Sequence, residues 1–136
     1  MSPFLQRLVE LISGRPAPAR EGEFWEARAA DFLKSKGLSI LARNVRMRLG
    51  EIDIIALDRD TVVFVEVKKR NSREFGGPEH AIGPKKRRRI LRAAREILVR
   101  EHLSSRPCRF DAVLIYTGGD KPEFQHIVDA FGEYNR

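Results

Sequence analysis

The fold of this chain is decided by the stretch 50–57, Gly-Glu-Ile-Asp-Ile-Ile-Ala-Leu, and by the stretch 62–68, Val-Val-Phe-Val-Glu-Val-Lys. Both are rich in Val and Ile, and a short polar segment separates them. This pattern predicts a β-hairpin whose strands are covered on both faces. Strands of that kind carry almost no charge. Asp53, Glu66 and Lys68 are exceptions that need an explanation.

The expected register of the hairpin brings its charged residues together. A two-residue turn at 59–60 places Asp53 opposite Glu66. In the same register Glu51 lies opposite Lys68. Because side chains alternate along a strand, all four are predicted on one face. The other face then takes the apolar residues Ile52, Ile54, Val65 and Val67. Opposed like charges destabilise a ladder, so the two acids call for a cation, and a divalent metal is the obvious candidate.

Composition describes one basic domain. The chain has 136 residues, with 26 Lys and Arg against 19 Asp and Glu, a formal charge of +7. This excess favours a polyanionic partner, although charge alone is weak evidence. The single cysteine, Cys108, excludes an internal disulfide and a Cys-rich zinc site, and it fits a reducing cytoplasm. No apolar run is long enough to span a membrane and no signal pattern begins the chain, so we predict a soluble, cytoplasmic protein without a membrane partner.

The chain divides near residue 20. Residues 4–12 have the apolar spacing of a short amphipathic helix, and a Gly and Pro-rich linker follows. We therefore predict an N-terminal segment over 1–20 and a single domain over 21–136.

The first helix of that domain is predicted from about Glu21 to Lys36, with Gly37 as its C-cap. Its inward side takes Glu26, Ala29, Ala30 and Leu33. Two explanations of the inward carboxylate stay open. Glu26 either edges the core near the positive end of the helix dipole or points to the hairpin as a third carboxylate.

A strongly basic helix is predicted to begin at Pro84. Its apolar face takes Ile90, Leu91, Ala94, Ile97 and Leu98, and its opposite side Lys85, Arg88, Arg89, Arg92 and Arg95. Lys86 and Arg87 fall on the inward side. Five consecutive cations at 85–89 oppose the helix dipole at a cost of a few tenths to about 1 kcal/mol each. Phosphate contact is therefore the favoured interpretation, with plain solvation as the alternative.

The remaining segments complete a sheet. Residues 39–48 predict an edge strand with arginines along one side, 110–116 a further buried strand, and 123–131 a last strand anchored by Phe131. Residues 71–83, which include His80, read as an exposed loop. Such a loop is a lid, a DNA-contacting arm, a dimer contact or simply disordered.

Several separated motifs resemble one known family. They are Gly22-x-x-x-Glu26-x-x-Ala29, Asn44-x-Arg46, Gly50-Glu51-Ile52-Asp53-Ile54-Ile55-Ala56, Phe64-Val65-Glu66-Val67-Lys68-x-Arg70, Phe75-Gly76, Lys86-x-x-Arg89-Ile90 and Arg109-Phe110-Asp111. Each is weak alone, but in this order they closely resemble the bacterial YraN family, relatives of archaeal Holliday-junction resolvases within the PD-(D/E)XK nuclease superfamily. The resemblance implies a restriction-endonuclease-like α/β fold with a mixed central β-sheet flanked by helices.

The resemblance also implies roles for individual residues. Asp53 and Glu66 match the metal-binding acids, Lys68 the catalytic lysine, and Glu26 the acid on the preceding helix. Ile52 stands where the superfamily pattern has proline. Independently of the family, Mg²⁺ (or Mn²⁺) suits a site made of these two acids and the Val67 carbonyl, because hard cations prefer oxygen ligands.

The leading hypothesis is therefore a metal-dependent endonuclease acting on DNA, with branched, resolvase-type DNA as a candidate substrate. The expected nucleic-acid contacts are Arg46, Arg70, Lys85, Lys86, Arg88 and Arg89. Three alternatives stay open. The chain is a nucleic-acid-binding or scaffolding protein without turnover, or a homodimeric interaction module that associates through 71–83, or its charged hairpin residues form only a salt-bridged patch.

Overall fold

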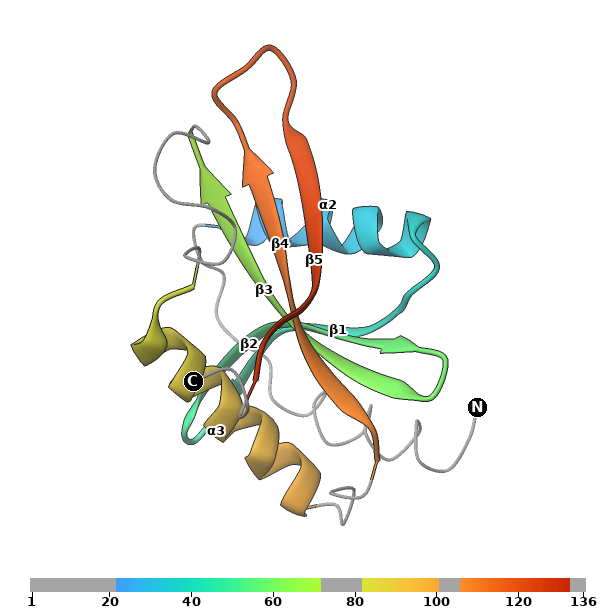
Figure 1. The fold of residues 1–136 in the computed structure, drawn as a ribbon, viewed down its shortest axis with the longest axis vertical. Helices are drawn as coiled ribbons and strands as arrows, with labels where there is room; N and C mark the ends of the chain where they lie inside the picture. The colour runs from blue at the N-terminus through green and yellow to red at the C-terminus, as the bar shows by residue number, and fades with distance from the viewer. Residues whose placement is uncertain (1–21, 72–81, 101–105, 133–136) are drawn as a thin grey trace.

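The computed structural model describes residues 22–71, 82–100 and 106–132, which form a five-stranded sheet with a helix on each face (Figure 1). The elements are, in chain order, α2 (Glu23–Ser35), β1 (Ser39–Met47), β2 (Gly50–Asp58), β3 (Thr61–Arg70), α3 (Pro84–Arg100), β4 (Cys108–Tyr116) and β5 (Glu123–Phe131). The predicted helix at 4–12, its linker, and most of the predicted loop, including His80, lie outside the described residues. No helix in the described part of the chain is long and apolar enough to cross a membrane.

The sheet is mixed, as predicted. Its strand order is β1-β2-β3-β4-β5, and every neighbouring pair is antiparallel except β3 and β4, which run parallel. Two parallel neighbours need a crossover connection, and α3 lies in the segment between them. This α/β architecture confirms the predicted fold class and is consistent with a restriction-endonuclease-like fold.

The central hairpin has the predicted register. The β2–β3 ladder runs from the pair Asp58–Thr61 to the pair Ile54–Val65. The two residues between Asp58 and Thr61 form the turn, and Arg59 takes a left-handed conformation there with φ of 57°. Positive φ is what tight hairpin turns require.

Each face of the sheet has its own apolar core beneath one helix. Under α2 the fully buried members include Ala29, Leu33, Ile54, Val63, Val113 and Ile115. Under α3 they include Ile52, Ile55, Phe64, Ala93 and Ile97. On α3, Ala93 replaces Leu91 in the predicted buried set, and Leu91 is half-buried.

The predicted sharing of one face by Ile52 and Ile54 is wrong. Ile52 packs beneath α3, whereas Ile54 packs beneath α2. The alternation of side chains is broken between them, opposite Asn44 of β1, which has a φ of 54°. A left-handed residue inside a strand interrupts regular alternation. The predicted pairs Asp53–Glu66 and Glu51–Lys68 lie beyond the last backbone pair of the ladder. Of the four charged residues predicted to share one face, Asp53, Glu66 and Lys68 line one hollow, whereas Glu51 lines another beside Arg46.

Candidate metal centre

Asp53 and Glu66 lie where strands β2 and β3 separate. The last backbone pair of the ladder is Ile54 with Val65, and beyond it the Val67 N–H donates to Asp53 Oδ2 at 2.9 Å. A side-chain carboxylate therefore occupies the place of a backbone acceptor. Asp53 is 6% exposed and Glu66 5% exposed, so the hairpin buries both acids at its open end.

The two carboxyl groups interact directly. The pKa of Glu66 is raised to about 8, first by burial and then by the charge and hydrogen bond of the neighbouring Asp53 carboxyl group, while the Lys86 ammonium acts to lower it. Lys86 Nζ lies 3.4 Å from Glu66 Oε1, and its side chain is 44% exposed. Without a stronger cation, Glu66 therefore retains its proton at neutral pH.

The acids open into a hollow of about 740 Å³ between the start of α2 and the end of β3. It is lined by Gly22, Phe24, Trp25, Glu26, Asp53, Glu66, Val67, Lys68, Lys69 and Lys86. We call this hollow the carboxylate pocket. All the residues predicted for catalysis and metal binding line it. Its aromatic wall and Lys69 did not follow from the sequence motifs.

Glu26 reaches this pocket from the first turn of α2. The helix begins after Gly22, whose φ of 100° is left-handed, and the Glu26 N–H donates to the Gly22 carbonyl at 3.0 Å. Glu26 is 5% exposed and lies on the predicted buried side of the helix. At its C-terminus α2 ends with the Leu38 N–H bonded to the Leu33 carbonyl at 3.1 Å, around Gly37. The position of Glu26 is compatible with both sequence-based explanations.

The chemistry of these donors fits Mg²⁺ or Mn²⁺. No three acidic, histidine or cysteine side chains in the described ranges gather closely enough to cage an ion by themselves. Magnesium does not need such a cage, because it is bound through one or two carboxylates and keeps water and substrate phosphate oxygens in its shell. Asp53, Glu66 and the Val67 carbonyl supply oxygen atoms at the wall of an open pocket.

The predicted nucleic-acid contacts separate into groups. Lys86 and Arg89 line a second hollow of about 480 Å³ together with Arg46, which pairs with Glu51 at 3.4 Å. Lys85 and Arg88 are exposed on α3, and Arg70 ends β3, where its carbonyl accepts from the Thr117 N–H at 2.9 Å. Arg87, predicted to point inward, donates from Nε to the Ile82 carbonyl at 2.8 Å. The basic run thus divides into residues directed to distinct parts of the surface.

A second buried acid, Asp111 on β4, was not singled out as a site by sequence reasoning. It is 0% exposed, and its carboxylate accepts from Arg109 Nε at 3.0 Å and from the Asp129 N–H at 2.9 Å. His126 Nε2 lies 2.7 Å from Asp111 Oδ2. Arg109 Nη1 also donates to Asp58 at 2.8 Å. We call this the Asp111 network.

The pKa of the buried acid in the Asp111 network is shifted in the opposite direction from the pKa of Glu66 in the carboxylate pocket. Burial acts to raise the pKa of Asp111, but hydrogen bonds from His126, Arg109 and the Asp129 N–H outweigh it, and the pKa falls below its usual value. The sequence signal for this network was an acid inside a buried strand. Arg109 and Asp58, which are hydrogen-bonded in this network, lie 51 residues apart in the sequence, so residue spacing alone did not identify the network.

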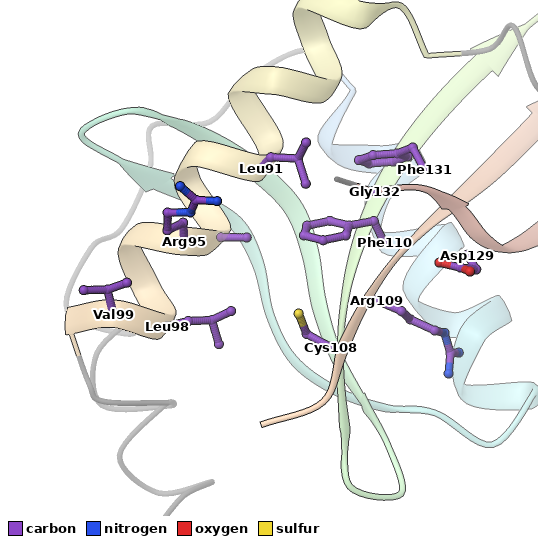
Figure 2. Close-up of a pocket in the computed structure, with 11 residues that line it drawn as sticks. Leu91, Arg95, Leu98, Val99, Cys108, Arg109, Phe110, Asp129, Phe131 and Gly132 are labelled. Carbon is purple, nitrogen blue, oxygen red and sulfur yellow. The ribbon is translucent and has the colours of Figure 1, made fainter. Parts of the chain in front are cut away.

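A largely apolar hollow of about 440 Å³ lies on the α3 side of the sheet (Figure 2). Leu91, Leu98, Phe110 and Phe131 are among its apolar lining residues, and in Figure 2 the Arg109 side chain extends away from Leu91 and Phe110. Among the described residues Asp129 is its single carboxylate. It lacks the paired acids of the carboxylate pocket and does not suit a metal centre.

Comparison with known proteins gives one consistent result. Residues 25–115 match the model of the uncharacterised protein family UPF0102. A UPF0102 protein of Clostridioides difficile is 40% identical over 111 residues, which cover 82% of this chain and 96% of that protein. A UPF0102 protein of Symbiobacterium thermophilum is 48% identical over 101 residues, which cover 74% and 86%. One of Geotalea daltonii is 47% identical over 111 residues, which cover 81% and 87%.

Proposed function

We propose that this chain, which belongs to the UPF0102 family, is a metal-dependent endonuclease that hydrolyses phosphodiester bonds in DNA. The observation that carries the proposal is the geometry of the carboxylate pocket. Two buried acids on adjacent strands lie side by side, at the wall of an open hollow, next to lysine side chains. Burying two acids together costs folding free energy unless a cation compensates them.

Each residue of the pocket has a distinct role in this proposal. Asp53 and Glu66, with the Val67 carbonyl, would hold the metal, which would lower the pKa of water and screen phosphate charge. The hydrogen bond from the Val67 N–H fixes the orientation of the Asp53 carboxylate at 2.9 Å. Lys68 lines the same pocket and orients the attacking water or stabilises the charge that develops on the phosphate. Glu26 closes the wall on the α2 side.

DNA as the substrate is supported by the distribution of charge. The chain carries a formal charge of +7, and Lys86 of α3, which contacts Glu66, also lines a hollow with Arg46 of β1. Positive charge of this kind attracts a phosphate backbone without reading its sequence. Branched DNA is the substrate to test first, because the motifs resemble those of resolvases.

The experiment that tests this function is a cleavage assay on linear, flapped and four-way DNA with Mg²⁺ or Mn²⁺. The wild type is expected to cut, with the largest rate on a branched substrate. Asp53→Asn keeps the size of the side chain and is expected to abolish cutting while DNA affinity changes little. Cutting that persists in Asp53→Asn at the wild-type rate would identify a contaminating nuclease.

A metal-binding measurement separates a nuclease from a scaffold. Mn²⁺ binding, followed by the loss of its free paramagnetic resonance signal, is expected for the wild type and is expected to weaken strongly in Asp53→Asn. Glu23→Gln is a matched control, because Glu23 is an exposed acid of the same α2 turn as Glu26. DNA binding without metal binding or cleavage would instead support the scaffolding alternative.

A further inference from the structure

The second hollow beside the carboxylate pocket is strongly cationic. It lies between the β1–β2 turn and the first turns of α3, and has a volume of about 480 Å³. Four cationic side chains line it, Arg46, Arg48, Lys86 and Arg89, with Glu51 as the acid among them. We call it the cationic hollow.

The charges of the cationic hollow are not balanced by its own lining. Arg46 pairs with Glu51 at 3.4 Å, and the side chain of Arg46 is 51% exposed. One carboxylate thus stands among four cations drawn from two separate elements. The N-terminal end of α3 adds a positive dipole potential. These four cations repel one another. An anionic ligand bound among them would reduce that repulsion.

The two walls of the cationic hollow are packed tightly together. A Cβ added to Gly50 would lie 2.5 Å from the Arg89 carbonyl oxygen, so only glycine allows this approach of the turn to α3. The Leu49 N–H also donates to Glu96 Oε1 of the same helix at 3.4 Å. The two backbone segments that carry the cations are therefore held together before any ligand arrives, which reduces the entropy cost of binding.

Lys86 joins the cationic hollow to the carboxylate pocket. It lines both, and its Nζ lies 3.4 Å from Glu66 Oε1. Consecutive phosphates of a nucleic-acid strand are separated by one nucleoside. A strand that passes over Lys86 would present one phosphate to the acids and the next to the arginines.

We infer that the cationic hollow binds the backbone phosphate adjacent to the one held at the carboxylate pocket. This inference rests on the proposed function, and it names the ligand as a phosphodiester backbone with two neighbouring phosphates. It also separates the basic residues of α3. Lys86 and Arg89 contact a defined phosphate, whereas Lys85, Arg88 and Arg92, which do not line the hollow, contribute only long-range attraction.

The test uses the full chain labelled with ¹⁵N and the dinucleotide pTpT, which carries two neighbouring phosphates. Ca²⁺ replaces Mg²⁺ to limit turnover. Titration is expected to move the amide signals of Leu49 and Gly50, in the wall of the cationic hollow. In Arg46→Gln with Arg89→Gln the affinity is expected to fall about tenfold, because charge-assisted hydrogen bonds to phosphate are lost.

The matched control is Lys34→Gln with Arg92→Gln. It removes the same charge from exposed positions on α2 and α3, and its affinity for pTpT is expected to stay within about twofold of the wild type. TpT, which has one phosphate, is expected to bind more weakly than pTpT. The dispersion of the ¹⁵N spectrum shows whether each variant is folded.

Each of the other possible results overturns either this inference or the proposed function. Equal losses in the two double variants would reduce the effect to net charge and overturn the inference. Equal affinity for TpT and pTpT, or no shift at Leu49 and Gly50, would overturn it too, even where DNA is cut. If pTpT binds as expected but no DNA is cut, the nuclease function fails while the phosphate site stands.

Discussion

The carboxylate pocket and the Asp111 network bury acids in the same sheet under opposite conditions. Asp111 is surrounded by hydrogen-bond donors, and its pKa is lowered. Glu66 faces another carboxylate, and its pKa is raised to about 8. A buried carboxylate that accepts hydrogen bonds from several donors stabilises the fold, whereas a buried carboxylate beside another acid destabilises it. The difference distinguishes a structural cluster from a candidate functional one without reference to any relative.

The largest effect should come from breaking the Asp111 network. Asp111→Asn removes the buried charge that pairs with half-buried Arg109, so we expect a loss of about 3–5 kcal/mol in the free energy of unfolding, the usual cost of removing one partner of a buried ion pair. Urea denaturation followed by circular dichroism measures it. Asp53→Asn is the matched substitution, and it should leave the stability unchanged or raise it. Equal losses in both variants would erase the distinction between the two clusters.

The sequence predicted the features that depend on neighbouring residues. It did not predict the features that depend on contacts between residues far apart in the chain. The hairpin register followed from a two-residue turn, and the inward position of Glu26 followed from helical spacing. The change of face between Ile52 and Ile54 lies opposite the left-handed Asn44 of the neighbouring strand, and periodicity within one strand does not encode such a feature. Arg89 was predicted on the side of α3 opposite the core, yet it lines a hollow because the β1–β2 turn packs beside it.

The pH dependence of stability provides a second, smaller contrast. The unfolded chain loses the Glu66 proton near its ordinary pKa of 4.5, and the folded chain retains it up to about 8. Across that window the folded state binds more protons, so stability should fall as pH rises, by at most about 1.4 kcal/mol per pH unit. Melting temperatures between pH 5 and pH 8 measure it. Glu66→Gln should flatten the decline.

The Asp111 network should respond in the opposite direction. Its lowered pKa stabilises the fold above the ordinary Asp value of 3.8, and that stabilisation is lost as pH falls through the folded value. Glu66→Gln should therefore leave the acid limb of the profile intact while it changes the limb between pH 5 and pH 8. A decline near neutral pH that survives Glu66→Gln would mean that another group, and not the acid pair, causes it.

The smallest effect should come from Lys86, the cation that already contacts the acid pair. Its ammonium lies 3.4 Å from Glu66 Oε1, but the side chain is 44% exposed, so solvent screens the interaction. We expect Lys86→Gln to cost less than about 1 kcal/mol in stability. Because Lys86 lowers the pKa of Glu66, its removal should shift the pH-dependent decline to higher pH. Added Mg²⁺ should reverse that shift if a metal is the stronger cation, whereas a profile unmoved by both changes would show that the acid pair does not control stability near neutral pH.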